Sequence, residues 1–181
     1  MKEIIIFQIH MQEQSSFFSL PSLDHRDLLR KAAIGEEIDW RTITYEKVNR
    51  GQDCTFSSFG NLIFYCLHKQ QLSSILDKIP GLGYRTLQKL SGKPQLYILS
   101  NIETIDALDF NNSSVERLEN GKIFLINKFC FRPDLLGGKY LFYIKDYVGL
   151  FCTNNFTKMY KDENWTGFQF EEVWRGGEEK I

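Results

Sequence analysis

The sequence contains none of the short motifs that identify most small hydrolases and nucleotide-binding enzymes. There is no G-x-S-x-G nucleophile motif. Gly137-Gly138-Lys139 resembles the end of a phosphate-binding loop, but Pro133 and Tyr140 stand where that loop requires glycine and Ser or Thr. Gly81-Leu82-Gly83 lacks the third glycine of a dinucleotide-binding fingerprint. We therefore predict no catalytic residue and no bound cofactor.

Metal-ligand clusters and a disulfide framework are missing as well. The histidines His10, His25 and His68 are isolated, and none has a second histidine at metal-ligand spacing. The four cysteines are widely spaced and form no C-x-x-C pair: Cys54, Cys66, Cys130 and Cys152. We predict no metal site, and we predict reduced thiols that pack as small hydrophobic side chains.

The chain has no long hydrophobic run and no excess of either charge. The apolar stretch 4–7 is interrupted by Gln8 and His10, far short of the ~20 residues that a membrane helix needs. It also lacks the small-residue cleavage site of a signal peptide. The 22 basic and 23 acidic residues leave a formal net charge of -1, which gives no attraction to nucleic acid or acidic membranes. We expect a cytoplasmic protein that binds neither.

Hydrophobic residues make up 43% of the 181 residues, enough for a sizeable core. They occur in the periods of both strands and short helices, which predicts an α+β fold with a mixed or mainly antiparallel sheet and a few short helices. No linker rich in Pro, Ser or Gly divides the chain. We predict a single α+β domain over 1–181, with possible lobes at 1–94 and 95–174 and a frayed tail at 175–181.

Two stretches share one order of elements. Residues 62–90 contain an apolar strand, an amphipathic helix, a glycine break and a returning strand, and residues 150–174 repeat this order. Either an internal duplication or chance explains the likeness, because strand–helix–strand units are common. In the second stretch Phe168 and Phe170 share a face of the last strand. We expect both to pack against Phe156 and Met159 of the helix.

Local signals predict two further details. Asn120-Gly121 lies between two apolar stretches and favours positive φ, which indicates a hairpin turn. Thr153, Asn154 and Asn155 precede the second helix, and each has a short side-chain oxygen that suits a helix N-cap.

Three carboxylates are the best candidates for chemistry. Asp106 and Asp109 are three residues apart and share a face if the segment is helical, which fits either a solvated face or a catalytic pair. Alternation from Phe168 and Phe170 places Glu172 on the apolar side of its strand. Either a bulge or strand end changes the register there, or Glu172 has a buried partner.

The tryptophans are the candidates for contact with another protein, because large amphipathic rings dominate binding hot spots. Trp165 follows a helix and is expected in the core. Trp174 precedes the polar tail and fits core packing or an exposed anchor equally well. We take Trp40, Glu172 and Trp174 as the candidate partner-binding residues.

Several segments together resemble an α+β family of bacterial immunity proteins encoded beside polymorphic toxins. The resemblance spans residues 36–174. It is carried by Asp39-Trp40, Leu62-Ile63-Phe64, the helix ending at Ile79, Tyr97-Ile98-Leu99-Ser100-Asn101-Ile102, Asp106-Ala107-Leu108-Asp109, Leu141-Phe142, Leu150-Phe151 and Gly167-Phe168-Gln169-Phe170-Glu171-Glu172-Val173.

The resemblance implies a non-catalytic protein that binds a cognate toxin domain and neutralises it. Two alternatives remain open. One is a small enzyme whose carboxylates Asp106, Asp109 and Glu172 converge in the fold, and the other is a regulatory binding module without a toxin partner. A deep polar cleft around those carboxylates favours the enzyme, whereas a flat aromatic or acidic patch favours the binding protein.

Overall fold

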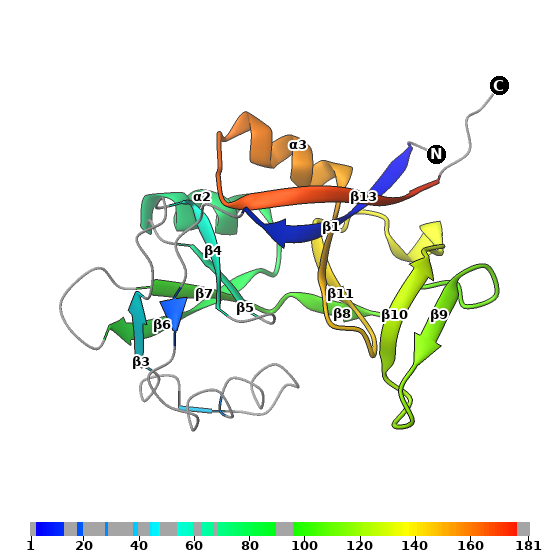
Figure 1. Ribbon diagram of the computed structural model, residues 1–181. Helices are drawn as coiled ribbons and strands as arrows, with labels where there is room; N and C mark the ends of the chain where they lie inside the picture. Colours follow the sequence, from blue (N-terminus) through cyan, green and yellow to red (C-terminus); the bar gives the residue numbers. More distant parts are fainter. Residues whose placement is uncertain are drawn as a thin grey trace. The chain divides into compact units, whose positions relative to one another are not determined.

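The computed structural model describes residues 3–12, 18–19, 28, 38–39, 44–47, 54–59, 63–66, 69–89 and 96–176. The chain folds into two compact units, each built from separate segments. Unit 1 comprises Met1–His10, Glu103–Asn164 and Gln169–Ile181, and unit 2 comprises Met11–Ile102 and Trp165–Phe168. Figure 1 shows their elements along the chain. The predicted division into one domain with lobes at 1–94 and 95–174 stays a prediction.

The sheet of unit 1 is built mainly from the C-terminal half of the chain. Its strands lie in the order β13-β1-β12-β11-β8. β12 pairs antiparallel with β1 and β11, whereas β11 pairs parallel with β8. The bounds are β1 Ile4–Met11, β8 Glu103–Ile105, β11 Leu141–Ile144, β12 Leu150–Thr153 and β13 Phe168–Gly176.

β13 runs antiparallel to its neighbour β1. Arg175 near the end of β13 pairs with Glu3 at the start of β1, and Glu171 pairs with His10 near the end of β1. Because residue numbers rise on one strand as they fall on the other, the strands run in opposite directions. β1 is therefore antiparallel to both neighbours, and β12 and β13 on either side of it run parallel to each other.

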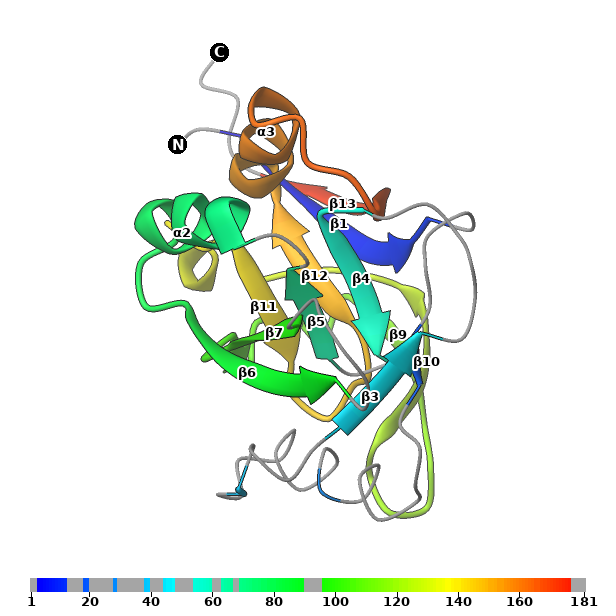
Figure 2. The same ribbon diagram turned by 90° about the vertical axis from the view of Figure 1, so that its left-hand side faces the viewer.

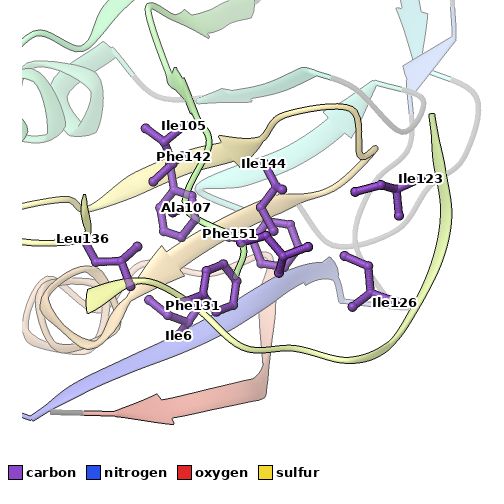
Figure 3. Packing of buried hydrophobic residues seen from close by; sticks show 11 residues of the cluster. Ile6, Ile105, Ala107, Ile123, Ile126, Phe131, Leu136, Phe142, Ile144 and Phe151 are labelled. Carbon is purple, nitrogen blue, oxygen red and sulfur yellow. The ribbon is translucent and has the colours of Figure 1, made fainter. Parts of the chain in front are cut away.

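Aromatic and β-branched side chains fill the core of unit 1. Phe142 and Phe151 are fully buried and stack with ring centroids 5.9 Å apart, while Phe131 meets both rings edge-on or nearly so. Figure 3 shows this cluster, with Ile6 contributed by β1 and Ile123 and Ile126 by a separate strand. Burying large rings contributes most of the hydrophobic stabilisation that a domain of this size gains.

That separate strand belongs to a hairpin, formed by β9 (Ser114–Arg117) and β10 (Ile123–Lys128) as a two-stranded antiparallel sheet. The predicted turn at Asn120-Gly121 is confirmed: the Leu118 N–H donates to the Lys122 carbonyl, and Gly121 has φ +82°. Figure 1 shows the hairpin as its own two strands. A glycine at positive φ suits the three-residue loop that closes a bulged hairpin.

Unit 2 contains a second sheet, with the order β2-β3-β6-β7-β5-β4. β3 and β6 pair parallel, whereas the pairs β2–β3, β4–β5, β5–β7 and β6–β7 are antiparallel. The bounds are β2 Phe18–Ser19, β3 Thr44–Lys47, β4 Phe56–Phe59, β5 Ile63–Cys66, β6 Gly83–Lys89 and β7 Leu96–Ser100.

The two predicted strand–helix–strand stretches are present, and they share a topology. The first is β5, α2 (Lys69–Lys78) and β6, and the second is β12, α3 (Asn154–Asp162) and β13. In each stretch the first strand is preceded by its antiparallel partner: β4 precedes β5, and β11 precedes β12. In both, one antiparallel strand lies between the two parallel strands: β7 in unit 2 and β1 in unit 1 (Figure 2).

The start of α3 differs from the predicted cap. Thr153 occupies the N-cap position, but its hydroxyl makes no cap hydrogen bond and donates to the Lys139 carbonyl at 2.6 Å. The Asn154 side chain accepts from the Ile5 N–H and donates to the Glu3 carbonyl. The polar side chains at this helix start therefore hold neighbouring strands, because tertiary partners compete for the same oxygen atoms.

The segment between α3 and β13 contributes to the core of unit 2. Phe168 stacks on Phe56 at 4.5 Å, and Trp165 meets Phe56 edge-on at 5.6 Å. Trp165 is buried, as predicted. The predicted contact between Phe170 and Phe156 is confirmed in unit 1 at 6.2 Å, with Tyr160 closer at 4.9 Å. The stacking of Phe168 on Phe56 was not predicted, because residue 56 is far away in sequence.

The fold class is α+β with mixed, mainly antiparallel sheets, as predicted from the sequence. Across the described ranges, no helix is both long and apolar enough to span a membrane.

Candidate partner-binding surface

The predicted contact residue Glu172 is exposed in unit 1 and ion-paired. Arg175 donates to its two carboxylate oxygens at 3.0 and 2.9 Å, and to Glu3 at 2.8 Å. These hydrogen bonds from Arg175 hold the pKa of Glu172 below its usual range. Because Glu172 is exposed, the alternative with a buried partner is wrong. The alternation of the strand ends at this point, since Glu171 and Glu172 are both exposed and the next two residues are both partly buried. Trp40 lies outside the described residues.

Trp174 packs against the core of unit 1. It is partly buried, and its ring meets Phe131 at 5.7 Å. A Cβ built at Gly176 would lie 2.2 Å from the Trp174 ring, so any larger residue there would require the ring to shift. The ring thus has a packing role, and only its remaining exposed edge is available to a partner.

The two aspartates are engaged separately. Asp109 accepts from the Asn111 N–H at 3.0 Å and from the Asn112 amide at 2.7 Å. The Asn112 side chain is the largest cause of the lowered pKa of Asp109. Asp106 pairs with Arg132 at 3.8 Å. The helical alternative for this segment is wrong: residues 103–105 form β8, and Leu108 makes an isolated bridge to Phe131.

An open depression of about 470 Å³ lies beside Asp106. Glu103 and Asp134 also line it, together with Lys139, which is ion-paired with Glu103. Asp109 and Glu172 are not among its lining residues, so this depression does not bring together the three carboxylates that the enzyme alternative requires. Within the described part of the chain, no three His, Cys, Asp or Glu side chains are grouped to hold a metal ion.

Burial, and not a reactive environment, explains the shifted pKa values of Tyr143 and Cys152. Desolvation raises the pKa of Tyr143 to about 12 and raises the pKa of the Cys152 thiol well above its usual range. Both groups are therefore protonated near neutral pH. A protonated, buried thiol is inert, because the thiolate is the nucleophile.

Sequence reasoning missed an exposed apolar surface at one end of the β9–β10 hairpin, which we call the tip patch. Its members are Leu118, Phe124, Leu125 and Val148, whose exposed fractions are 47%, 65%, 41% and 58%. Val148 follows Asp146, whose carbonyl accepts from the Ile123 N–H at 2.8 Å. This hydrogen bond holds the β11–β12 turn beside the start of β10, so the four side chains come from adjacent backbone.

The register of the hairpin explains why these residues face outward. Leu125 pairs with Glu116, and Ile126 pairs with Val115. The register shifts between Ile123 and Leu125, which makes Phe124 an extra, bulged residue. Ile123 and Ile126 are buried while Phe124 and Leu125 are exposed. The run of four apolar residues at 123–126 was the signal, because a strand cannot turn four consecutive side chains to one face.

Comparison with known proteins identifies a family. The model of the Immunity protein family (Imm11) matches residues 85–175. No curated protein matches this sequence.

Proposed function

Because the chain belongs to the Immunity protein family (Imm11), we propose that it is a non-catalytic immunity protein that binds a cognate toxin domain and neutralises it. Immunity of this kind requires a rigid scaffold and one complementary surface of roughly 800 Å² per partner. The partner is a protein, and the activity is stoichiometric binding in the cytoplasm.

The family match is the observation that carries this proposal, and the arrangement of the carboxylates supports it. Asp109 serves a turn and Glu172 serves an ion pair, so of the three predicted carboxylates Asp106 is the one that lines the open depression. A general acid–base pair needs two carboxyl groups within reach of one substrate. Binding needs no such convergence.

The test is protection of a cell that expresses the toxin. The candidate toxin is the C-terminal domain encoded by the neighbouring reading frame, and complex formation is measured with the purified toxin domain. We expect protection and a stable complex with the wild-type chain. Absence of both would refute the immunity function.

Substitutions separate binding from catalysis. Replacing Asp106 or Asp109 by Asn should leave protection intact wherever the fold survives, and so should replacing His68, which lies outside the described residues. Replacing Trp174 by Ala should weaken the complex by about 2 kcal/mol, the usual hot-spot scale, mainly through faster dissociation. Protection that depends on one carboxylate while the complex still forms would favour the enzyme alternative.

A further inference from the structure

The tip patch is not required by the core that it borders. Ile123 and Ile126 already supply the inward side chains of β10, at 5% and 7% exposure. Phe124 sits on the opposite side at a bulge, where a polar residue would satisfy the same backbone. Single exposed apolar residues are common, but contiguous groups of large ones mark interaction sites. The hairpin thus presents a surface beyond what folding needs.

The surroundings of the tip patch favour a protein partner. Its exposed charged neighbours carry both signs, four basic and three acidic: Glu116, Arg117, Glu119, Lys122, Lys128, Lys145 and Asp146. An apolar centre with a polar rim of mixed sign is the usual composition of a protein interface. Nucleic acid and acidic membranes select an excess of positive charge. A small ligand would need enclosing walls, whereas these four side chains are 41–65% exposed.

The family match identifies the kind of protein. All four members of the tip patch, and their charged neighbours, lie within the matched residues 85–175. A protein of an immunity family has a toxin as its partner. We therefore expect the apolar surface within the matched region to bind that toxin. This step rests on the immunity function proposed above.

We propose that the tip patch is a contact surface for the toxin domain, with Phe124 as its central anchor, in addition to the exposed edge of Trp174. Phe124 is the most exposed of the four and belongs to the residue class that dominates hot spots. Leu125 and Val148 flank it and exclude water from its edge on binding. Lys122 and Glu119 in the hairpin turn steer the encounter.

The experiment uses the full chain and the purified toxin domain from the neighbouring reading frame. The test variant is the double substitution Phe124→Ser, Leu125→Ser, and Val148→Ser is a second, independent test. Tyr84→Ser and Leu135→Ser are matched controls, because they remove exposed apolar side chains elsewhere, at 43% and 38% exposure. Binding kinetics, urea unfolding and sedimentation are measured for each variant.

We expect the double variant to raise the dissociation constant about 30-fold or more, mostly through faster dissociation. Val148→Ser should raise it about 3-fold, and both controls should bind as the wild type does. The urea midpoint of the double variant should stay within experimental error of the wild type, because the replaced side chains face solvent.

The possible outcomes distinguish the surface from the function. A wild-type chain that neither binds nor protects refutes the immunity function, and the contact surface with it. A wild-type chain that binds while the double variant binds equally well refutes the surface alone. A large fall in the urea midpoint of the double variant means that the chain itself covers the patch. A wild-type dimer that the double variant dissociates means that a second copy covers it. Either result overturns the proposal.

Discussion

The two strand–helix–strand stretches share a topology but take the strand at its centre from different parts of the chain. In unit 2 the strand between β5 and β6 is β7, which directly follows β6. In unit 1 the strand between β12 and β13 is β1, from the other end of the chain. The shared topology fits either an internal duplication or chance, and the central position is filled by a local strand in one stretch and by a distant strand in the other. The two stretches differ in how far apart in sequence the paired strands are, and therefore in the chain entropy that is lost when the intervening loop closes.

The helix-to-strand connections of the two stretches also differ, in the surroundings of the glycine that each contains. The connection after α2 contains Gly81 at φ +81°, with open space where a Cβ would point. The connection after α3 contains Gly167 at φ +109°, where a Cβ would lie 2.0 Å from the Phe56 carbonyl oxygen. One glycine serves the backbone conformation alone, and the other also permits a close approach between backbones.

The largest expected effect comes from the two central strands. Ile6 of β1 is fully buried and Ile98 of β7 is 1% exposed, so Ile6→Ala and Ile98→Ala should each cost about 2–5 kcal/mol of unfolding free energy. Ile6 pairs with Thr153, whereas Ile98 pairs with the nearer Tyr65 and Arg85. We therefore expect Ile6→Ala to act mainly by accelerating unfolding. Stopped-flow measurement of the refolding and unfolding rates in urea tests this expectation. A variant whose main change is slower refolding would contradict it.

The glycine pair gives the next largest effect. Gly167→Ala should destabilise by about 3 kcal/mol or more, because it combines an unfavourable φ with a backbone clash. Gly81→Ala is the matched control and should cost only about 1–2 kcal/mol, the cost of a left-handed residue. Equal urea midpoints for the two variants would show that the close approach at Gly167 is relieved by a shift of the backbone.

A smaller effect is expected from the ion pair between Glu172 and Arg175, which both lie on β13. Arg175 lowers the pKa of Glu172 in the folded chain, so the stabilisation is complete above the ordinary carboxyl pKa. It is lost as the pH falls through the lowered, folded pKa. Glu172→Gln should therefore flatten the pH dependence of the urea midpoint below the ordinary carboxyl pKa. Glu119→Gln in the exposed hairpin turn is the control, and an equal change in both variants would contradict the role of Arg175.

The smallest effect concerns the thiols, whose labelling reports on burial without changing stability. Cys130 and Cys152 are free thiols in unit 1. Burial raises the pKa of Cys152, so a maleimide should react far more slowly there than at the partly buried Cys130. After unfolding without reductant, mass measurement should find four labels. Two or four missing labels would reveal disulfides.

Sequence periodicity alone determined most elements of the second half of the chain. The strands at β11, β12 and β13, the helix α3 and the hairpin turn at Gly121 all follow from apolar spacing and turn residues. Their signals are local, because side-chain direction along a strand or helix depends on position within the element. The family resemblance was also readable, since three of its segments within 85–175 fall on β11, β12 and β13.

Only the tertiary structure decided which distant segments meet. Nothing near Asn154 in sequence reveals that its side chain holds Ile5 and Glu3, and nothing near Phe168 reveals Phe56. The exposure of Phe124 likewise depends on a bulge whose position is set by pairing with β9. Strand alternation specifies two faces but does not say which face will be covered. That choice belongs to non-local contacts, which for this chain determine both the core of unit 1 and the surface it leaves exposed.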